Sequence, residues 1–260
     1  KQLYYNMEID INERLKCIWS QDYFKDLPPY ILSREYVYSI NNCKKEILIT
    51  GINPSFRSNE CEKSGSFDFQ NIMDSKKWDT YWGPIKKMLY DIENNIDLRA
   101  QTAYLDIFYF REKNQKILKK ELLKNGIPFI IEQLNLTQKI IEYIIQPKLI
   151  IVKNRESAAY WGRYSNENII WMGYELEFIE TNNYGDLFKI IGLIPSNQRI
   201  APEILNTNLL NSLILFTNHI NQFTSKEKRP TAFFINELLK KSKKTITNKI
   251  TLPIFGEVAI

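Results

Sequence analysis

Short apolar runs separated by amphipathic helical stretches constrain the fold of this chain more than any other feature. Each run is rich in β-formers and short enough for one buried strand, and apolar residues at helical spacing recur between the runs. Such alternation favours a parallel sheet with helices on both sides. We therefore predict an α/β fold, a three-layer α/β/α sandwich around a central, mainly parallel four-stranded sheet. The predicted strands are 45–50, 102–110, 148–153 and 187–194, and the helices between them include 81–92, 129–145 and 157–164.

The pattern divides the 260 residues into an N-terminal helical extension packed on the core, an α/β domain, and a basic C-terminal helix with a tail. An amphipathic helix over 205–224 is predicted to close the domain, and a second helix over 230–244 has a proline near its first turn. A small hairpin is predicted over 169–181, turning at 172–174, before the last strand. The boundaries of the three parts are 1–44, 45–225 and 226–260.

Composition removes several classes of function. No apolar run approaches the roughly 20 residues that cross a bilayer, so we expect a soluble protein with no membrane partner. Three cysteines, Cys17, Cys43 and Cys61, and one histidine give no zinc or iron–sulfur pattern, so we expect no metal, no cofactor and a reduced, cytoplasmic location. The histidine, His219, falls beside the apolar stripe of the predicted helix 205–224, which favours a structural role over a catalytic one.

Positive charge is concentrated near the C-terminus. Between Lys226 and Lys249 the chain has eight basic residues and two glutamates, whereas the rest is close to neutral. A basic segment of this kind suits a polyanion such as DNA, and Lys240 and Lys241 are the candidate contacts. A solvated, lysine-rich end of a helix explains the same pattern equally well.

Two loops stand directly after predicted strands, where an open parallel sheet binds its ligands. The first, 51–56, reads Gly-Ile-Asn-Pro-Ser-Phe, and the last, 194–199, reads Ile-Pro-Ser-Asn-Gln-Arg. Taken alone, Asn-Pro is a common turn, and Ser and Asn commonly cap a helix. Each loop by itself is therefore better explained by local structure than by a site.

Taken together, the motifs resemble the uracil-DNA glycosylase superfamily, in particular its mismatch-specific uracil/thymine branch. The resemblance covers about 45–223 and implies the uracil-DNA glycosylase-like fold, double-stranded DNA with a flipped base as partner, and no cofactor; we expect a monomer. The motifs that carry it are Gly-Ile-Asn-Pro at 51–54, the aromatic pair Phe67 and Phe69, Thr-Tyr-Trp at 80–82, and the Pro-Ser loop at 195–196.

The resemblance implies that Asn53 holds the attacking water. Its amide is neutral, so it orients the water without taking a proton. Phe69 matches the aromatic platform on which the flipped base stacks, with Phe67 as the fallback, although Phe69 lies further from Asn53 than in the family, and both could simply pack the loop. Ile52 completes this side of the predicted base pocket.

Ser55 and Asp106 point to the identity of the base. Ser55 stands where efficient uracil-specific enzymes have a tyrosine against C5, so a C5 substituent would fit unless Phe56 or Tyr109 fills the space. Asp106 stands where those enzymes have an asparagine. An ionised carboxylate only accepts hydrogen bonds and favours the exocyclic amine of cytosine, whereas a protonated one could donate, and a capping or salt-bridge role is the structural alternative.

The last loop departs from the superfamily, because Ile194 replaces the histidine that stabilises the departing base. The mismatch-specific branch also lacks that histidine, and Ser196, with backbone N–H groups, would take its place. Arg199 would fill the gap that the flipped base leaves. The predicted catalytic residues are Asn53 and Ser196, and the predicted DNA contacts are Arg57, Asn197, Gln198, Arg199, Lys240 and Lys241.

These residues predict a monofunctional DNA glycosylase that removes a C5-modified cytosine, for example glucosylated hydroxymethylcytosine in phage DNA, and leaves an abasic site. Such an enzyme would serve anti-phage defence. No lysine stands at the position of Asn53, so a Schiff-base lyase is not implied. The alternatives are a uracil/thymine mismatch-repair glycosylase and a non-catalytic nucleic-acid-binding relative.

Overall fold

A six-stranded mixed sheet forms the centre of the computed structural model, which describes residues 10–22, 26–56, 63–77, 79–114, 116, 118–218 and 220–247. The strand order is β6-β2-β7-β10-β9-β8. The first four strands are parallel to one another, β9 is antiparallel to β10, and β8 is antiparallel to β9. The α/β class is confirmed, whereas the four-stranded sheet was wrong, since the sheet has six strands and mixed directions. The strands are β2 (Ile47–Gly51), β6 (Thr102–Asp106), β7 (Leu149–Val152), β8 (Tyr174–Asn182), β9 (Gly185–Leu193) and β10 (Leu213–Thr217).

The four parallel strands are short and buried along their whole length, and β2, β7 and β10 are mainly apolar. Successive side chains of a strand point to opposite faces, so each strand contributes to two separate clusters. Leu48 and Ile150 belong to one cluster, and Ile49 and Ile151 belong to the other. Burial on both faces is typical of parallel strands, and it explains why these runs are continuously apolar rather than alternating.

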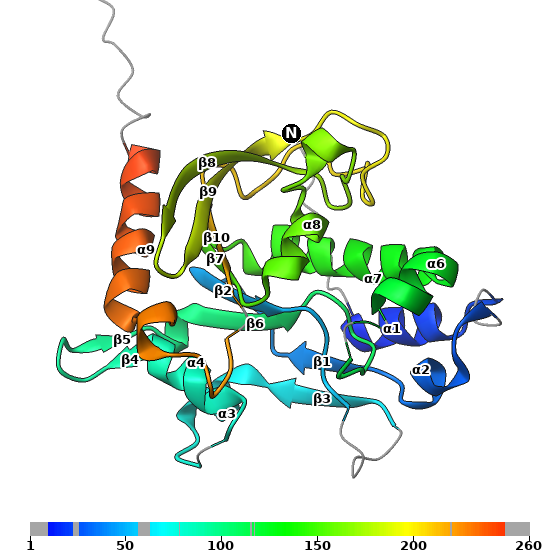
Figure 1. Ribbon diagram of the computed structural model, residues 1–260, viewed down its shortest axis with the longest axis horizontal. Coiled ribbons are helices and arrows are strands. Elements are labelled where there is room, and N and C mark those ends of the chain that lie inside the picture. Colours follow the sequence, from blue (N-terminus) through cyan, green and yellow to red (C-terminus); the bar gives the residue numbers. More distant parts are fainter. Residues whose placement is uncertain are drawn as a thin grey trace, which may run out of the picture.

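Helices pack against both faces (Figure 1). Leu15 and Ile18 of α1 join the first cluster together with Phe129 of α7, whereas Ile85 of α4 and Ile235 of α9 join the second. The helices are α1 (Ile11–Trp19), α2 (Pro29–Ser33), α3 (Phe69–Asp74), α4 (Trp82–Leu89), α6 (Leu123–Asn125), α7 (Ile127–Lys139, continued by a π-helical segment, Ile140–Ile145), α8 (Ala158–Trp161) and α9 (Ala232–Thr247).

The N-terminal part contributes a strand as well as helices. Strand β1 (Val37–Ile40) pairs in parallel with β3 (Gly65–Asp68) in a separate two-stranded sheet, so the predicted helical extension over 1–44 is only partly helical. Helix α1 packs on α7 through Trp19, whose ring meets Phe129 edge-on with centroids 4.9 Å apart. The remaining strands, β4 (Tyr90–Asp91) and β5 (Ile96–Asp97), form a short hairpin.

The predicted helix over 205–224 is wrong, because the sheet strand β10 occupies its centre. The run Leu213–Phe216 is continuously apolar and lies between β7 and β9, with both faces covered. The helical spacing was misleading, since apolar residues in an unbroken run fit either period.

The hairpin prediction over 169–181 was also misplaced. The hairpin is β8–β9, and its tip lies beside α9 (Figure 1). Its turn contains Tyr184, whose ring packs on Phe234 of α9 with ring centroids 4.5 Å apart. Gly173, where the turn was expected, has φ +69° and ends the irregular segment before β8. The glycine therefore marks the entry into the hairpin and not its tip.

Candidate functional site

The carboxyl ends of the parallel strands meet at one edge of the sheet. From β2 the chain passes to β6 on one side, and later to β7 on the other, so the direction of strand order reverses beside β2. Open α/β sheets bind ligands in the crevice at such a reversal. The residues at this edge are Gly51, at the end of β2, Asp106, at the end of β6, and Lys153, directly after β7.

Asn53 is buried in the loop that follows β2. Its amide nitrogen donates to the carbonyls of Pro54 (2.9 Å), Phe110 (3.4 Å) and Glu112 (2.6 Å). The last two carbonyls belong to the loop after β6. The Asn53 side chain therefore joins two loops at the predicted edge of the sheet.

Backbone hydrogen bonds join the same two loops beyond the ends of their strands. Ile107 N–H donates to Gly51, Phe108 N–H donates to Ile52, and Glu112 N–H donates to Pro54, at 2.9–3.1 Å. Of the predicted base-binding residues, Ile52 is buried here and Ser55 is exposed. Phe56 lies against the guanidinium groups of Arg34 and Arg111, and Tyr109 is in the core, where its hydroxyl contacts Thr137.

Asp106 is buried and lies at the end of a hydrogen-bonded chain of side chains. The Tyr104 hydroxyl donates to Asp106 Oδ1 (2.8 Å), and the Tyr81 and Tyr104 hydroxyls are 2.5 Å apart. Burial raises the pKa of Asp106 to about 6, an increase that the positive charge of Lys153 opposes. Within the described part of the chain, Tyr104 is the hydrogen-bond donor that reaches this carboxylate, and it uses one of the two oxygens.

Lys153 is the functional candidate that the sequence reasoning missed. Its ammonium donates to the Tyr81 hydroxyl (3.1 Å) and lies over the rings of Tyr81 and Tyr104, 4.3 and 4.9 Å from their centroids. The residue is 4% exposed. Burial lowers the pKa of Lys153 to about 8, against the opposing effect of Asp106. A lysine that ends a buried apolar run was the available signal.

Because Gly51 has no side chain, it leaves room for the hydrogen-bonded side chains that connect Lys153 to Asp106 through Tyr81 and Tyr104. A Cβ at Gly51 would lie 2.0 Å from Asp106 Oδ1 and 2.6 Å from the Tyr104 hydroxyl, far closer than atoms can approach. Since β2 lies between β6 and β7, any side chain here would separate Asp106 from the groups that link it to Lys153. The glycine of the Gly-Ile-Asn-Pro motif is therefore required by packing at the edge.

The aromatic residues Phe67 and Phe69 pack together with Tyr104 and Trp82. The Phe69 ring stacks on Tyr104 at a centroid distance of 5.7 Å and an interplanar angle of 24°, and Phe67 is 5.4 Å from Trp82. Phe69 is buried and Phe67 is half-buried. The structure thus shows packing contacts for both rings: Phe69, the first residue of α3, is in the core, and Phe67 packs against its edge. This is the packing alternative to the platform role.

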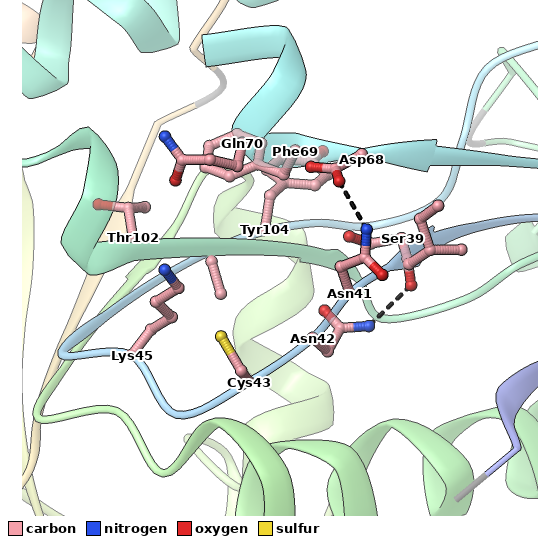
Figure 2. Close-up of a pocket in the computed structure, with 12 residues that line it drawn as sticks. Ser39, Asn41, Asn42, Cys43, Lys45, Asp68, Phe69, Gln70, Thr102 and Tyr104 are labelled. Atoms are coloured by element: carbon pink, nitrogen blue, oxygen red, sulfur yellow. Dashed lines mark hydrogen bonds between the residues drawn. The ribbon is translucent and has the colours of Figure 1, made fainter. Parts of the chain in front are cut away.

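A cavity of about 230 Å³ opens beside Phe69 and Tyr104 (Figure 2). It lies between the start of β6 and the turn that follows β1, and two amide side chains stand at its rim, where Asn41 donates to Asp68 and Asn42 donates to the Ser39 carbonyl. Asp106 and Ser55 are not among the residues that line it. The structure therefore does not bring Phe69, Asp106 and Ser55 to one cavity there.

The Pro-Ser loop lies at the opposite edge of the parallel strands from Asn53. Strand β9 is antiparallel to β10, with Gly185 paired to Thr217 and Lys189 to Leu213, so β9 leaves the sheet past the amino end of β10. The prediction that this loop meets the Asn53 loop was wrong, because it assumed a parallel last strand. The residues moved away from the edge by this reversal are Ser196, Asn197, Gln198 and Arg199.

Arg199 is buried and has a local role. Its guanidinium donates to the carbonyls of Ala201 (3.2 Å) and Pro202 (3.5 Å), and its methylenes pack against Gly173. Asn197 and Gln198 are exposed, and the Ser196 hydroxyl accepts from the Gln198 N–H. The side chain expected to enter DNA is thus part of the core of its own loop.

The basic C-terminal helix places its lysines at the same far edge. In α9, Lys243 pairs with Glu46, which directly precedes β2, at 3.2 Å, and Lys240 pairs with Glu237 at 2.8 Å. Lys240 and Lys241 are exposed near this amino edge and are not brought to Asn53. Arg57, Cys61 and His219 lie outside the described residues.

Over the described ranges, no group of three or more His, Cys, Asp or Glu side chains is arranged to hold a metal ion. The helices in those ranges include none with the length and apolar character needed to span a bilayer. Comparisons with protein-family models, with curated proteins and with solved structures gave no significant match.

Proposed function

We propose that the protein is a DNA glycosylase whose site lies at the carboxyl ends of β2, β6 and β7. The observation that carries the proposal is the placement of Asn53 in the loop after β2 and of Asp106 at the end of β6, beside the reversal of strand order, where the loops that follow these two strands are joined. The resemblance of the Gly-Ile-Asn-Pro motif to the glycosylases supports base excision as the reaction. The Pro-Ser loop gives no such support, since it lies at the other edge of the parallel strands.

In this proposal Asn53 orients the attacking water with its amide oxygen. The hydrogen bonds from its nitrogen to three carbonyls fix the orientation of the amide, so the oxygen has a defined direction before substrate binds. Cleavage leaves negative charge on the departing base, and a positive charge in a buried site stabilises it strongly. Lys153 is the cation nearest to Asp106 in the hydrogen-bonded chain and would supply that charge.

Asp106 supports a cytosine-type substrate. With a pKa of about 6, its carboxyl group is mainly ionised near pH 7.5 and offers only acceptors, which match the exocyclic amine of cytosine and repel O4 of uracil or thymine. Ser55 is exposed and leaves the loop open for a C5 substituent. We propose a C5-modified cytosine, such as glucosylated hydroxymethylcytosine in phage DNA, as the excised base.

A specific observation favours a second candidate, a nucleic-acid-binding protein without catalysis. The Asn53 amide and one oxygen of Asp106 are engaged within the protein, and Phe69 is packed in the core. These contacts are explained as well by a structural role for Asn53, Asp106 and Phe69 as by a catalytic one. The exposed lysines Lys240 and Lys241 would then bind the DNA backbone from the far edge.

The test uses purified protein and duplexes that contain uracil, a T:G mismatch, 5-hydroxymethylcytosine or its glucosylated form, followed by alkaline cleavage of abasic sites. The proposal predicts a product from the modified cytosines that Asn53→Ala reduces at least about 100-fold, whereas the exposed, distant Asn197→Ala leaves the rate unchanged. A product from uracil alone would replace the cytosine assignment by the mismatch-repair alternative. DNA binding without any product would favour the non-catalytic candidate.

A further inference from the structure

We propose that Lys153 is a nucleophilic amine that forms an imine with an aldehyde, and that its substrate class is the ring-opened sugar of an abasic site. The inference rests on the proposed function for the source of that sugar, and it adds a covalent step which a monofunctional glycosylase lacks. It is carried by the position of Lys153, by its incomplete set of hydrogen bonds and by the side chains that connect it to Asp106.

The amine has donor capacity that the protein does not use. An ammonium group has three N–H donors, and the Tyr81 hydroxyl is the acceptor that Lys153 reaches among the described residues. The ammonium also lies over the faces of the Tyr81 and Tyr104 rings. Because a buried ammonium is poorly solvated, Lys153 loses a proton more readily at this site than a lysine in water does.

The hydrogen bonds give the proton a direction and a destination. Lys153 donates to Tyr81, and Tyr104 donates to Asp106, so the single hydroxyl proton of Tyr81 must be donated to Tyr104. When Lys153 gives a proton to the Tyr81 hydroxyl, Tyr81 passes its own proton to Tyr104, and Tyr104 passes its proton to Asp106. Anion binding alone would need the cation but no such chain, whereas a nucleophilic amine needs a base to take its proton.

The backbone of Lys153 is fixed at the edge where the proposed reaction produces its sugar. Its backbone N–H donates to the Thr50 carbonyl of β2 (2.9 Å), and its backbone carbonyl accepts from the Ile220 N–H (3.2 Å). Lys153 therefore stands between β2, which leads into the Asn53 loop, and the segment that follows β10. The Asn53 loop begins directly after β2, so an abasic sugar held there would lie at the same edge of the sheet as the end of β7.

The step balances without a further reactant. The ammonium of Lys153 gives one proton to Asp106, and the neutral nitrogen attacks C1′ of the open-chain aldehyde to form a carbinolamine. The carbinolamine hydroxyl leaves as water after it takes that proton back, and the nitrogen lone pair forms the C=N bond. Ammonium and aldehyde thus become iminium and one water, with charge conserved.

The experiment supplies the abasic site directly, so that it does not depend on base excision. Full-length protein is incubated with a duplex that contains one preformed abasic site and with sodium cyanoborohydride, which reduces an imine to a stable secondary amine. We expect a covalent protein–DNA adduct on a denaturing gel, and peptide mapping of the wild-type adduct is expected to identify Lys153.

Lys153→Arg keeps the positive charge without an imine-forming amine and is expected to lower adduct yield at least about tenfold, whereas Lys16→Arg, at an exposed position in α1 where the lysine pairs with Glu13, is expected to keep it. The absence of an adduct with wild-type protein, or an adduct mapped to another lysine, would overturn the inference. An adduct at Lys153 without base release from any duplex would uphold it and reject the proposed function. Mapping of the wild-type adduct decides the matter even if Lys153→Arg fails to fold.

Discussion

Asp106 and Lys153 lie at the ends of β6 and β7, the two neighbours of β2, and two tyrosine hydroxyls connect them across the position where β2 ends in Gly51. The pair is buried, yet it has no direct salt bridge: each charge is bound to a hydroxyl instead. This arrangement makes the edge sensitive to small changes in packing and in proton binding.

Gly51→Ala is expected to disrupt the edge. Its Cβ would lie 2.0 Å from Asp106 Oδ1, so the carboxylate must move and the bond from Tyr104 is lost. We expect a loss of about 2 kcal/mol or more in the free energy of unfolding, measured by denaturant titration. The matched control is Gly65→Ala in β3, where a Cβ would make an ordinary contact of 3.6 Å with Val37. Equal effects of the two substitutions would contradict the packing argument.

Stability is expected to depend on pH through Asp106. Its pKa is raised from 3.8 to about 6 by burial, so the folded state holds the proton more tightly than the unfolded chain. The stabilisation is present below about pH 4 and is lost as pH rises through about 6. Relative to Asp106→Asn, wild-type protein should therefore lose about 2–3 kcal/mol over this range, since two pKa units correspond to that free energy.

The control for this pH dependence is Asp97→Asn. The hydrogen bond from Arg99 is the main cause that lowers the pKa of Asp97, so its contribution is lost as pH falls and the trend has the opposite sign. Unfolding titrations of the three proteins at pH 4, 5, 6 and 7 would separate the two effects. A wild-type curve parallel to that of Asp106→Asn would show that Asp106 keeps an ordinary pKa.

The Asn53 side chain is expected to hold two loops together. Asn53→Ala removes its bonds to the carbonyls of Phe110 and Glu112 and should cost about 1–3 kcal/mol of unfolding free energy. Asn53→Asp should cost more, although its shape is closer to the original, because it turns acceptor oxygens toward carbonyl oxygens. Ser55→Ala, at an exposed position in the same loop, is the control. A smaller loss for the aspartate than for the alanine would refute this account.

Arg199 is expected to contribute to stability and not to DNA binding. Arg199→Ala removes the bonds to Ala201 and Pro202 and the packing on Gly173, and should cost about 1–3 kcal/mol by thermal or denaturant unfolding. The salt dependence of DNA affinity should stay unchanged, since no phosphate contact is lost. The exposed neighbour is tested as Gln198→Ala and is expected to change neither property. A reduced salt slope for Arg199→Ala would restore its predicted role.

The sequence pattern was sufficient for the buried parallel strands and for several helices. The predicted 45–50 and 148–153 correspond to β2 and β7, and 230–244 corresponds to α9. Their runs are short, apolar and bounded by polar residues, so local pattern and tertiary burial agree. Strand β10 was missed because it lies in a longer apolar stretch that satisfies helical spacing as well.

The candidate site could be predicted only where strand direction was right. Asn53 follows β2 and Asp106 ends β6, its parallel neighbour, so the rule that ligands bind at carboxyl ends placed both at one edge of the sheet. Ser196 follows a strand whose residues give the same pattern in either direction, and only pairing with β10 determines that β9 is antiparallel. Lys153 depends on two tyrosines from separate elements, and no local spacing encodes that contact.

The continuation of hydrogen bonding past β2 and β6 has a thermodynamic consequence. The segments from Gly51 to Pro54 and from Ile107 to Glu112 are held to each other as firmly as strands, so a molecule bound there has little loop motion left to arrest. A molecule that binds there meets a largely preformed surface, and the amide protons of Ile107, Phe108 and Glu112, which donate to the other segment, should exchange with solvent about as slowly as those inside the sheet.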